Sequence, residues 1–348
     1  MISKDLNLIN SDDQYPLITI GITCFNAYET IERALRSAFS QEWPNFEVLV
    51  VDDFSIDGSK EILDHWGSTK KELKVFHNSK NEGCAFSRNI LVSNAAGKFI
   101  AFFDDDDSSR PERLRLQHKR LKDYEEKYST YLVACFSSGN RIYENGYIKK
   151  FKAVGNSEIV PIGLQMANYL LFNERLPKVK YGAGVPASGM FARKNIFKLV
   201  GGFDTSIRRQ EDVEFAIRFS FKGGHFIGIK EFVLDQYVSK SKDKSNKIEY
   251  ESSTYIIEKY SDYLKEKNFY DYLRKWMKMK YFHFISKDFM AFLILIQIFL
   301  KFPKRTIKHF SKSAYNRYLH ELLMNSKNVD SGLFNKFIKF LSQVFPLK

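Results

Sequence analysis

Residues 17–53, LITIGITCFNAYETIERALRSAFSQEWPNFEVLVVDD, decide the fold because they contain a complete strand–helix–strand pattern. Two short apolar runs, residues 17–25 and 46–53, are rich in β-branched residues and end in polar residues, as buried parallel strands do. Between them, residues 29–41 place five apolar side chains on one helical face: Ile31, Ala34, Leu35, Ala38 and Phe39. The stretch therefore predicts a βαβ unit.

The same alternation continues to about residue 103. Helical patterns cover residues 59–68 and 84–97, and apolar strand patterns cover residues 73–78 and 98–103. Helices that alternate with apolar strands predict an α/β fold with a doubly wound, mostly parallel sheet and flanking helices. Ligands of such sheets bind beyond the carboxyl ends of the strands.

Carboxylates follow two of these strands. Asp104, Asp105, Asp106 and Asp107 come directly after the strand at 98–103. One acid or serine here would serve as the N-cap of the following helix, but four mutually repelling carboxylates exceed that need and are typical of a divalent-cation site. Asp53 ends the strand at 46–53, where acids of mononucleotide-binding folds accept hydrogen bonds from a ribose or base.

Composition divides the chain in two. With 348 residues, 44% of them apolar, it is large enough for one main domain and an appendage. Residues 1–240 hold 33 Lys and Arg against 31 Asp and Glu, whereas residues 241–348 hold 21 against 10. We therefore predict a catalytic domain over residues 1–240 and a basic, amphipathic, helical region over residues 241–348. The basic region fits an anionic membrane surface or nucleic acid.

The cysteines and the N-terminus predict a cytoplasmic location. Three scattered cysteines, an odd number, argue against a disulfide framework and for a reducing compartment: Cys24, Cys84 and Cys135. Residues 1–13 lack the apolar segment of a signal peptide.

Three segments together resemble the family 2 glycosyltransferases, whose fold is called GT-A. They are LITIGITCFNAYETIERALRSAFSQEWPNFEVLVVDDFSIDGS (17–59), NEGCAFSRNILVSNAAGKFIAFFDDDDSSRPERL (81–114) and GVPASGMFARKNIFKLVGGFDTSIRRQEDVEFAIRF (184–219). The resemblance implies an inverting enzyme that depends on a metal and on a nucleotide-sugar donor. The chain lacks the Gln-x-x-Arg-Trp pattern associated with processive synthases, which favours addition of a single sugar.

The resemblance also implies donor-site residues. Thr23, Phe25 and Asp53 would surround the nucleotide base, and Arg88 would lie near the nucleotide. Asp104 and Asp106 would be the ends of the family's Asp-x-Asp motif. Because Asp105 and Asp107 are also acidic, the motif has two registers; we favour Asp106 as the ligand of Mn²⁺ or Mg²⁺, with Asp104 as a further ligand and Asp104 or Asp105 near the ribose.

Glu211 and Asp212 are the predicted catalytic acids. They follow the sequence GGFD at 201–204, which matches the family's motif, and the resemblance implies that Asp212 is the general base and that Glu211 orients or contacts the acceptor. An acceptor hydroxyl is a poor nucleophile near neutral pH, so a base must remove its proton. The alternative is two acids that only open a helix, where they interact favourably with its dipole.

The C-terminal region contains two apolar helical patterns. Residues 289–302 are apolar for about 14 positions, short of the roughly 20 that span a bilayer. Residues 333–345 place aromatic and aliphatic side chains on one face and lysines elsewhere. These patterns predict either helices packed on the catalytic domain or an interfacial anchor at the inner face of the cytoplasmic membrane.

The leading prediction is a glycosyltransferase that moves one sugar from a nucleotide-diphosphate sugar, with a UDP-sugar favoured, to a hydroxyl of a glycan or lipid-linked acceptor in bacterial surface polysaccharide synthesis. A sugar-phosphate nucleotidyltransferase is a second candidate, disfavoured because residues 22–29 lack glycine and lysine. A nucleic-acid-binding protein is a third, and it is disfavoured because the basic region shows no nucleic-acid motif.

Overall fold

The computed structural model describes residues 14–238 and 245–309, and it contains the predicted βαβ unit. Strand β1 (Ile18–Cys24), helix α1 (Ile31–Phe39) and strand β2 (Phe46–Asp52) form this unit, with β1 and β2 parallel. Strand β4 (Phe99–Asp104) runs parallel to β1 on its other side. The carboxyl ends of the three strands therefore lie side by side.

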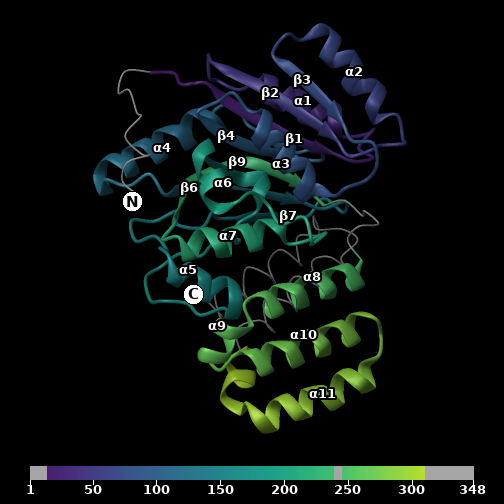
Figure 1. Ribbon diagram of the computed structural model, residues 1–348, viewed down its shortest axis with the longest axis vertical. Helices are drawn as coiled ribbons and strands as arrows, with labels where there is room; N and C mark the ends of the chain where they lie inside the picture. Colours follow the sequence, from purple (N-terminus) through teal and green to yellow (C-terminus); the bar gives the residue numbers. More distant parts are fainter. Residues whose placement is uncertain (1–13, 239–244, 310–348) are drawn as a thin grey trace, which may run out of the picture.

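The other elements of the sheet domain follow in chain order (Figure 1). They are α2 (Ser59–Thr69), β3 (Leu73–His77), α3 (Cys84–Asn94), β5 (Ser108–Ser109), α4 (Arg113–Tyr128), β6 (Val133–Ile142), β7 (Ile148–Phe151), α5 (Leu164–Phe172), the 3₁₀ turn η1 (Ala187–Gly189), β8 (Met190–Arg193), α6 (Lys194–Val200), α7 (Glu211–Phe221) and β9 (His225–Tyr237).

The strands form one mixed sheet in the order β3-β2-β1-β4-β8-β6-β9-β5, with β7 paired to β6. The first four strands of this order, β3, β2, β1 and β4, all run parallel, as the sequence predicts. Strand β8 then pairs antiparallel with both β4 and β6, and β9 pairs parallel with β6. The predicted α/β fold with flanking helices is confirmed, and the parallel pairing is concentrated in its N-terminal half.

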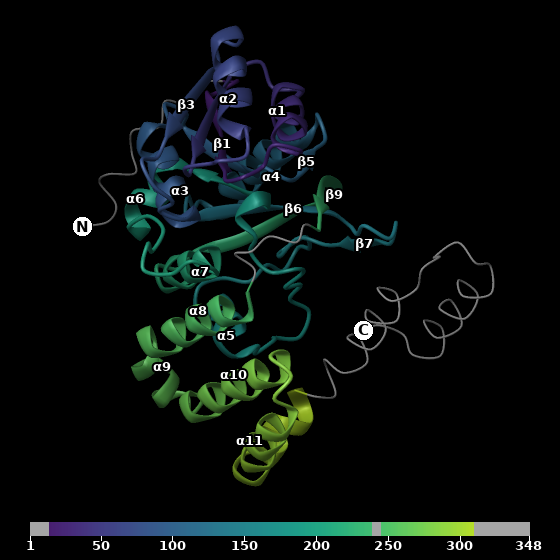
Figure 2. The same cartoon turned by 90° about the vertical axis from the view of Figure 1, so that its right-hand side faces the viewer.

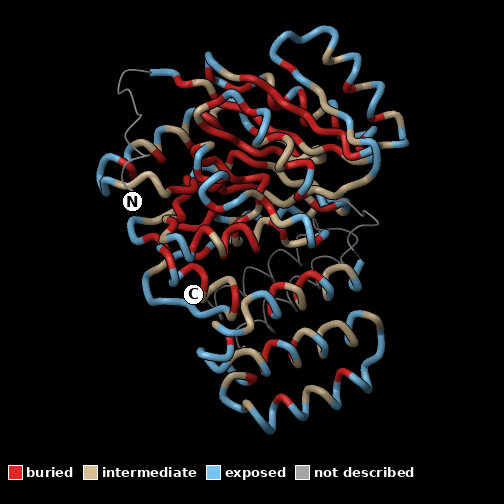
Figure 3. Tube along the Cα trace, in the orientation of Figure 1, coloured by how far each residue is buried: buried red, intermediate tan, exposed pale blue. Residues whose placement is uncertain are grey.

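Helices cover both faces of the sheet, and each face has its own apolar core. Helices α1, α2 and α4 contribute to the core on one face, whereas α3, α6 and α7 contribute to the core on the other. Alternation along β4 divides its side chains: Phe99 and Phe103 enter the first core and Phe102 the second. Figure 3 shows that the buried residues concentrate in this two-sided layer.

The C-terminal helices stack on the far side of α7 (Figures 1 and 2). They are α8 (Asn246–Lys259), α9 (Ser261–Glu266), α10 (Tyr270–Phe284) and α11 (Asp288–Lys301). Ile256 and Ile257 of α8 share a core with Ile217 of α7. The hydroxyl of Tyr260 donates a hydrogen bond to Glu214 at 3.0 Å.

The described helices therefore pack as a subdomain, one of the two predicted arrangements. The predicted amphipathic helix at 333–345 lies outside the described residues. The boundary between residues 240 and 241 stays a prediction. Within residues 14–238 and 245–309, every helix is too short or too polar to cross a membrane.

Candidate active site

Several segments converge at the carboxyl ends of β1 and β4. The backbone N–H of Phe25, after β1, donates to Asp105 Oδ2 at 2.9 Å. The backbone N–H of Tyr237, at the end of β9, donates to Asp107 Oδ1 at 3.3 Å. The Nη2 group of Arg33, on α1, donates to the carbonyl oxygen of Asp106 at 2.6 Å. These contacts fix the acidic loop from three sides.

Asp104, Asp106 and Asp107 form a cluster whose carboxylate oxygens lie within 4.8 Å of one another. Asp107 is only 5% exposed, and its buried Oδ2 atom has no hydrogen-bond partner. Burial and the charges of Asp104 and Asp106 raise the pKa of Asp107 to about 9. A set of hard oxygen donors with an unpartnered buried carboxylate oxygen fits a divalent cation, which would offset their repulsion.

The structure separates the four aspartates by orientation. The two predicted ligands, Asp104 and Asp106, belong to the cluster, and Asp107 is a third member that the prediction did not include. Asp105 instead binds the backbone of Phe25. Burial, followed by the charge of Asp106, raises the pKa of Asp105 to about 8.

Arg88 lies between the acidic cluster and helix α7. Its side chain is buried and donates hydrogen bonds to Glu211 and, at 3.4 Å, to Asp104 Oδ1. The guanidinium thus joins the end of β4 to the start of α7. Its predicted place near the nucleotide stays a prediction.

Asp212 lies in the first turn of α7 and is held by two backbone groups. Its carboxylate accepts hydrogen bonds from the N–H of Val213 at 2.7 Å and from that of Ala187 at 3.3 Å. Burial, and next the charge of Glu211, raise the pKa of Asp212 to about 7. A carboxylate with this pKa can both accept and release a proton near neutral pH.

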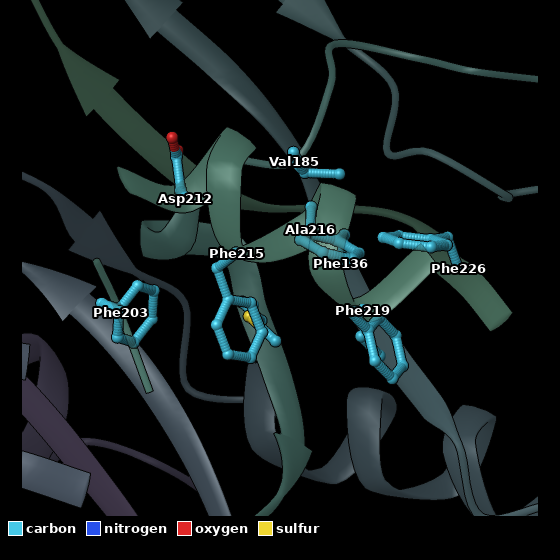
Figure 4. Close-up of a pocket in the computed structure, with 10 residues that line it drawn as sticks. Phe136, Val185, Phe203, Asp212, Phe215, Ala216, Phe219 and Phe226 are labelled. Atoms are coloured by element: carbon cyan, nitrogen blue, oxygen red, sulfur yellow. The ribbon is translucent and has the colours of Figure 1, made fainter. Parts of the chain in front are cut away.

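An apolar pocket lies beside Asp212 (Figure 4). Asp212 is the single charged residue of the lining, and the other nine are apolar: Ala134, Phe136, Val185, Met190, Phe203, Phe215, Ala216, Phe219 and Phe226. The cavity of about 10 Å³ is at the lower limit for one water molecule. Apolar surroundings favour the neutral form of the acid.

Left-handed backbone conformations mark the same region. Gln210, directly before Glu211, has φ of 65°. Asn26 and Phe54, which follow β1 and β2 closely, have φ of 50° and 66°. Side-chain-bearing residues rarely adopt this conformation, and it recurs at functional sites.

The predicted base-binding residues line the ends of β1 and β2. The Oγ1 atom of Thr23 lies 3.4 Å from Cys84 Sγ. Asp53 accepts hydrogen bonds from Asn78 Nδ2 at 2.7 Å and from the N–H groups of Glu82 at 2.9 Å and Gly83 at 2.7 Å. Asp53 therefore orders the loop that precedes α3, and its contact with a base stays a prediction.

Four residues that border the site were not predicted from the sequence: Arg33, Ser188, Gln236 and Tyr237. The Arg33 guanidinium carbon lies 3.9 Å from the centre of the Tyr237 ring, although the two are far apart in the sequence. The Nε2 group of Gln236 donates to Ser188 Oγ at 3.0 Å. The pairing of β9 with β6 and β5 brings Gln236 and Tyr237 to the acidic loop.

Comparisons with known proteins find glycosyltransferases and polysaccharide biosynthesis proteins among the relatives of this chain. TuaG of Bacillus subtilis, a glycosyltransferase assigned to teichuronic acid biosynthesis, is 32% identical over 29% of this chain and 40% of its own length. The succinoglycan biosynthesis protein ExoO of Rhizobium meliloti is 35% identical over 31% of this chain and 30% of its own length. The chain thus matches less than half of either relative.

A solved structure shares the fold. The structure of Staphylococcus aureus TarS residues 1–349 with UDP-GlcNAc superposes with a TM-score of 0.53, at 18% identity, over 77% of this chain and 73% of that one. The model of the family described as "Glycosyl transferase family 2" matches residues 19–194, about half of the chain. This chain therefore belongs to glycosyltransferase family 2, as the resemblance predicts.

Proposed function

We propose that this glycosyltransferase moves a single sugar, with inversion, from a nucleotide-diphosphate sugar to a hydroxyl of a glycan or lipid-linked acceptor in bacterial surface polysaccharide synthesis. The observation that carries the proposal is the partly buried carboxylate of Asp212, whose pKa is raised to about 7, on one side of Arg88, with the Asp104–Asp106–Asp107 cluster on the other. The names of TuaG and ExoO support the polymer, and TarS with UDP-GlcNAc supports a UDP-sugar as donor.

Donor binding would use the ends of β1, β2 and β4. Thr23, Phe25 and Asp53 would surround the base, Arg88 would act near the nucleotide, and Asp105 would fix the loop after β1 through its hydrogen bond to Phe25. Asp104, Asp106 and Asp107 would hold Mn²⁺ or Mg²⁺. A bound divalent cation would neutralise the charge that develops on the leaving diphosphate.

Asp212 would act as the general base. The N–H groups of Val213 and Ala187 orient its carboxylate, and apolar side chains pack beside it. With a pKa of about 7, it would accept the proton of the acceptor hydroxyl as the new bond forms. Glu211, held by Arg88, would position this end of α7 against the acceptor.

The outer face of α11 would hold the enzyme at an anionic lipid surface of the cytoplasmic membrane. Phe289 and Leu300 are 72% and 76% exposed. Five further large apolar side chains of α11 are also exposed: Met290, Phe292, Leu293, Ile296 and Phe299. Residues 245–309 carry 13 Lys and Arg against 7 Asp and Glu, so their charge complements acidic headgroups.

The proposal is tested by incubating the protein with Mn²⁺ and a panel of nucleotide sugars and measuring nucleotide release, with and without candidate acceptors. We expect nucleoside diphosphate release from one donor, with a UDP-sugar favoured. A nucleotidyltransferase would instead release pyrophosphate from a nucleoside triphosphate and a sugar 1-phosphate. Pyrophosphate release in a parallel assay with a nucleoside triphosphate and a sugar 1-phosphate, with no diphosphate release from any nucleotide sugar, would contradict the proposal.

A further inference from the structure

Two cationic side chains stand directly opposite each other in the β6–β7 hairpin, which extends from the sheet (Figure 2). Arg141 of β6 is the cross-strand partner of Lys149 of β7. Like charges in such a position repel each other. Neither side chain forms an ion pair with a described residue. Arg141 instead contacts neutral groups: its guanidinium carbon lies 5.7 Å from the centre of the Phe151 ring, and it donates a hydrogen bond to Gln236.

A chain of contacts connects this pair to the proposed base. Arg141 Nη2 donates to Gln236 Oε1 at 3.3 Å, and Gln236 Nε2 donates to Ser188 Oγ at 3.0 Å. Ser188 directly follows Ala187, whose N–H donates to Asp212. The pair therefore lies two side chains away from the segment that orients Asp212.

Further lysines continue the positive charge away from the site. Lys150 and Lys152 follow Lys149, and Lys178 and Lys180 lie on the neighbouring segment. Backbone hydrogen bonds join the two segments: the N–H of Ala183 donates to the carbonyl of Lys152 at 2.9 Å. These four lysines form no ion pair with a described residue, so they add positive charge to both faces around the hairpin.

We infer that Arg141 and Lys149 bind an anionic group of the acceptor, so that the acceptor is an acidic glycan bearing carboxylate or phosphate groups. A guanidinium and an ammonium on directly paired residues suit the oxygens of such a group, and a bound anion offsets their repulsion. The donor diphosphate is the weaker candidate because its charge would be met by the divalent cation proposed at the Asp104–Asp106–Asp107 cluster. That the bound anion belongs to the acceptor rests on the proposed function.

Binding measurements with the full chain test the inference. The probes are a tri-galacturonate for carboxylate, inorganic pyrophosphate for phosphate, and maltotriose as a neutral trisaccharide, all titrated by calorimetry in metal-free buffer at low salt. UDP is titrated separately with Mn²⁺. The variants are Arg141→Gln and Lys149→Gln, and the control is Lys150→Gln, which removes a neighbouring charge from the opposite face of β7.

We expect the wild-type chain to bind tri-galacturonate or pyrophosphate more tightly than maltotriose. Each variant should lower the affinity for the preferred anion by about fivefold to tenfold, the loss expected for one charged hydrogen bond at a partly exposed site. Lys150→Gln should change it by less than about twofold. Tighter binding of tri-galacturonate would indicate that the anionic group is a carboxylate, and tighter binding of pyrophosphate would indicate a phosphate.

Three results would overturn the inference. These are equal affinity for the acidic and neutral probes, anion affinities unchanged in both variants, or a matching loss of UDP affinity, which would assign the pair to the donor. If the pair binds anions but no donor is turned over, the anion site stands and the proposed function fails. If a donor is turned over and the variants bind anions normally, the proposed function stands and the anion site fails.

Discussion

Arg88 and Glu211, 123 positions apart in the sequence, form an ion pair in the interior of the protein. Helices α3 and α7 bring them together because both pack on the same face of the sheet. The pair joins the start of α7 to α3, and removing one partner would leave an uncompensated charge in the interior. The charge of Glu211 also acts on its neighbour Asp212, and this relation can be measured.

We expect the rate constant kcat/KM to rise with pH through an apparent pKa of about 7, because Asp212 must lose its proton to act as a base. The variant Glu211→Gln should move this limb to lower pH, since the charge of Glu211 raises the pKa of Asp212. The check is a set of initial rates from pH 5 to 9. As a control, Glu251→Gln on the surface of α8 should leave the limb in place; an unshifted limb in Glu211→Gln would argue against Asp212 as the base.

Two carboxylate variants separate base catalysis from metal binding. Asp212→Asn should lower kcat by at least about a hundredfold and leave donor affinity nearly unchanged, because the base acts in the transition state. Asp106→Asn should lose turnover and also weaken UDP binding in Mn²⁺ by at least about tenfold. Calorimetric titration of UDP and initial rates check both variants.

The exposed α4 residue Asp123 supplies the matched control for this pair, and Asp123→Asn should behave as wild type. Full activity of Asp106→Asn, or of the wild-type chain in excess EDTA, would refute the metal proposal. If Asp212→Asn loses donor binding as fully as Asp106→Asn, Asp212 is not the base and Glu211 becomes the next residue to test.

The acidic cluster should destabilise the metal-free protein as the pH rises. Asp107 keeps its proton up to a pKa of about 9 in the folded chain, whereas an unfolded chain ionises near the ordinary value, so stability falls between those two pH values. At pH 8 without metal, Asp107→Asn should therefore melt at least about 2–4 °C higher than wild type. Thermal denaturation followed by circular dichroism measures this difference.

Addition of Mn²⁺ should reverse the order of the melting temperatures of wild type and Asp107→Asn. The wild-type melting temperature should rise, and that of Asp107→Asn should rise less, because the variant lacks one ligand. Asp123→Asn should follow wild type in both conditions. A lower melting temperature for metal-free Asp107→Asn at pH 8 would mean that the cluster carries no such strain.

Membrane attachment through α11 predicts a loss of liposome binding when its outer face becomes polar. The double variant Phe292→Ser and Leu300→Ser should float with anionic liposomes at least about tenfold less than wild type, because two exposed apolar contacts are removed. The control Ile159→Ser replaces a similarly exposed residue of the sheet domain. Equal flotation of wild type and double variant would rule out α11 as the attachment surface.

The strand and helix pattern of residues 17–103 was readable from the sequence because it depends on local periodicity. The acids at the ends of β2 and β4 were also predictable as neighbours, since parallel strands bring their carboxyl ends to one edge of a sheet. The motif around Glu211 and Asp212 was found by resemblance to the family, and its place beside Arg88 required the packed helices.

Tertiary structure decided which groups each of the four adjacent aspartates contacts. Neighbouring side chains in a turn point in different directions, so spacing along the chain could not show that Asp105 turns to Phe25 while Asp107 joins Asp104 and Asp106. The roles of Gln236 and Arg141 depend on the pairing of β6 with β9, which unites residues about 95 positions apart. The sequence determined which chemical groups the chain carries at its strand ends, because periodicity is local, and only packing over long separations determined which of those groups meet.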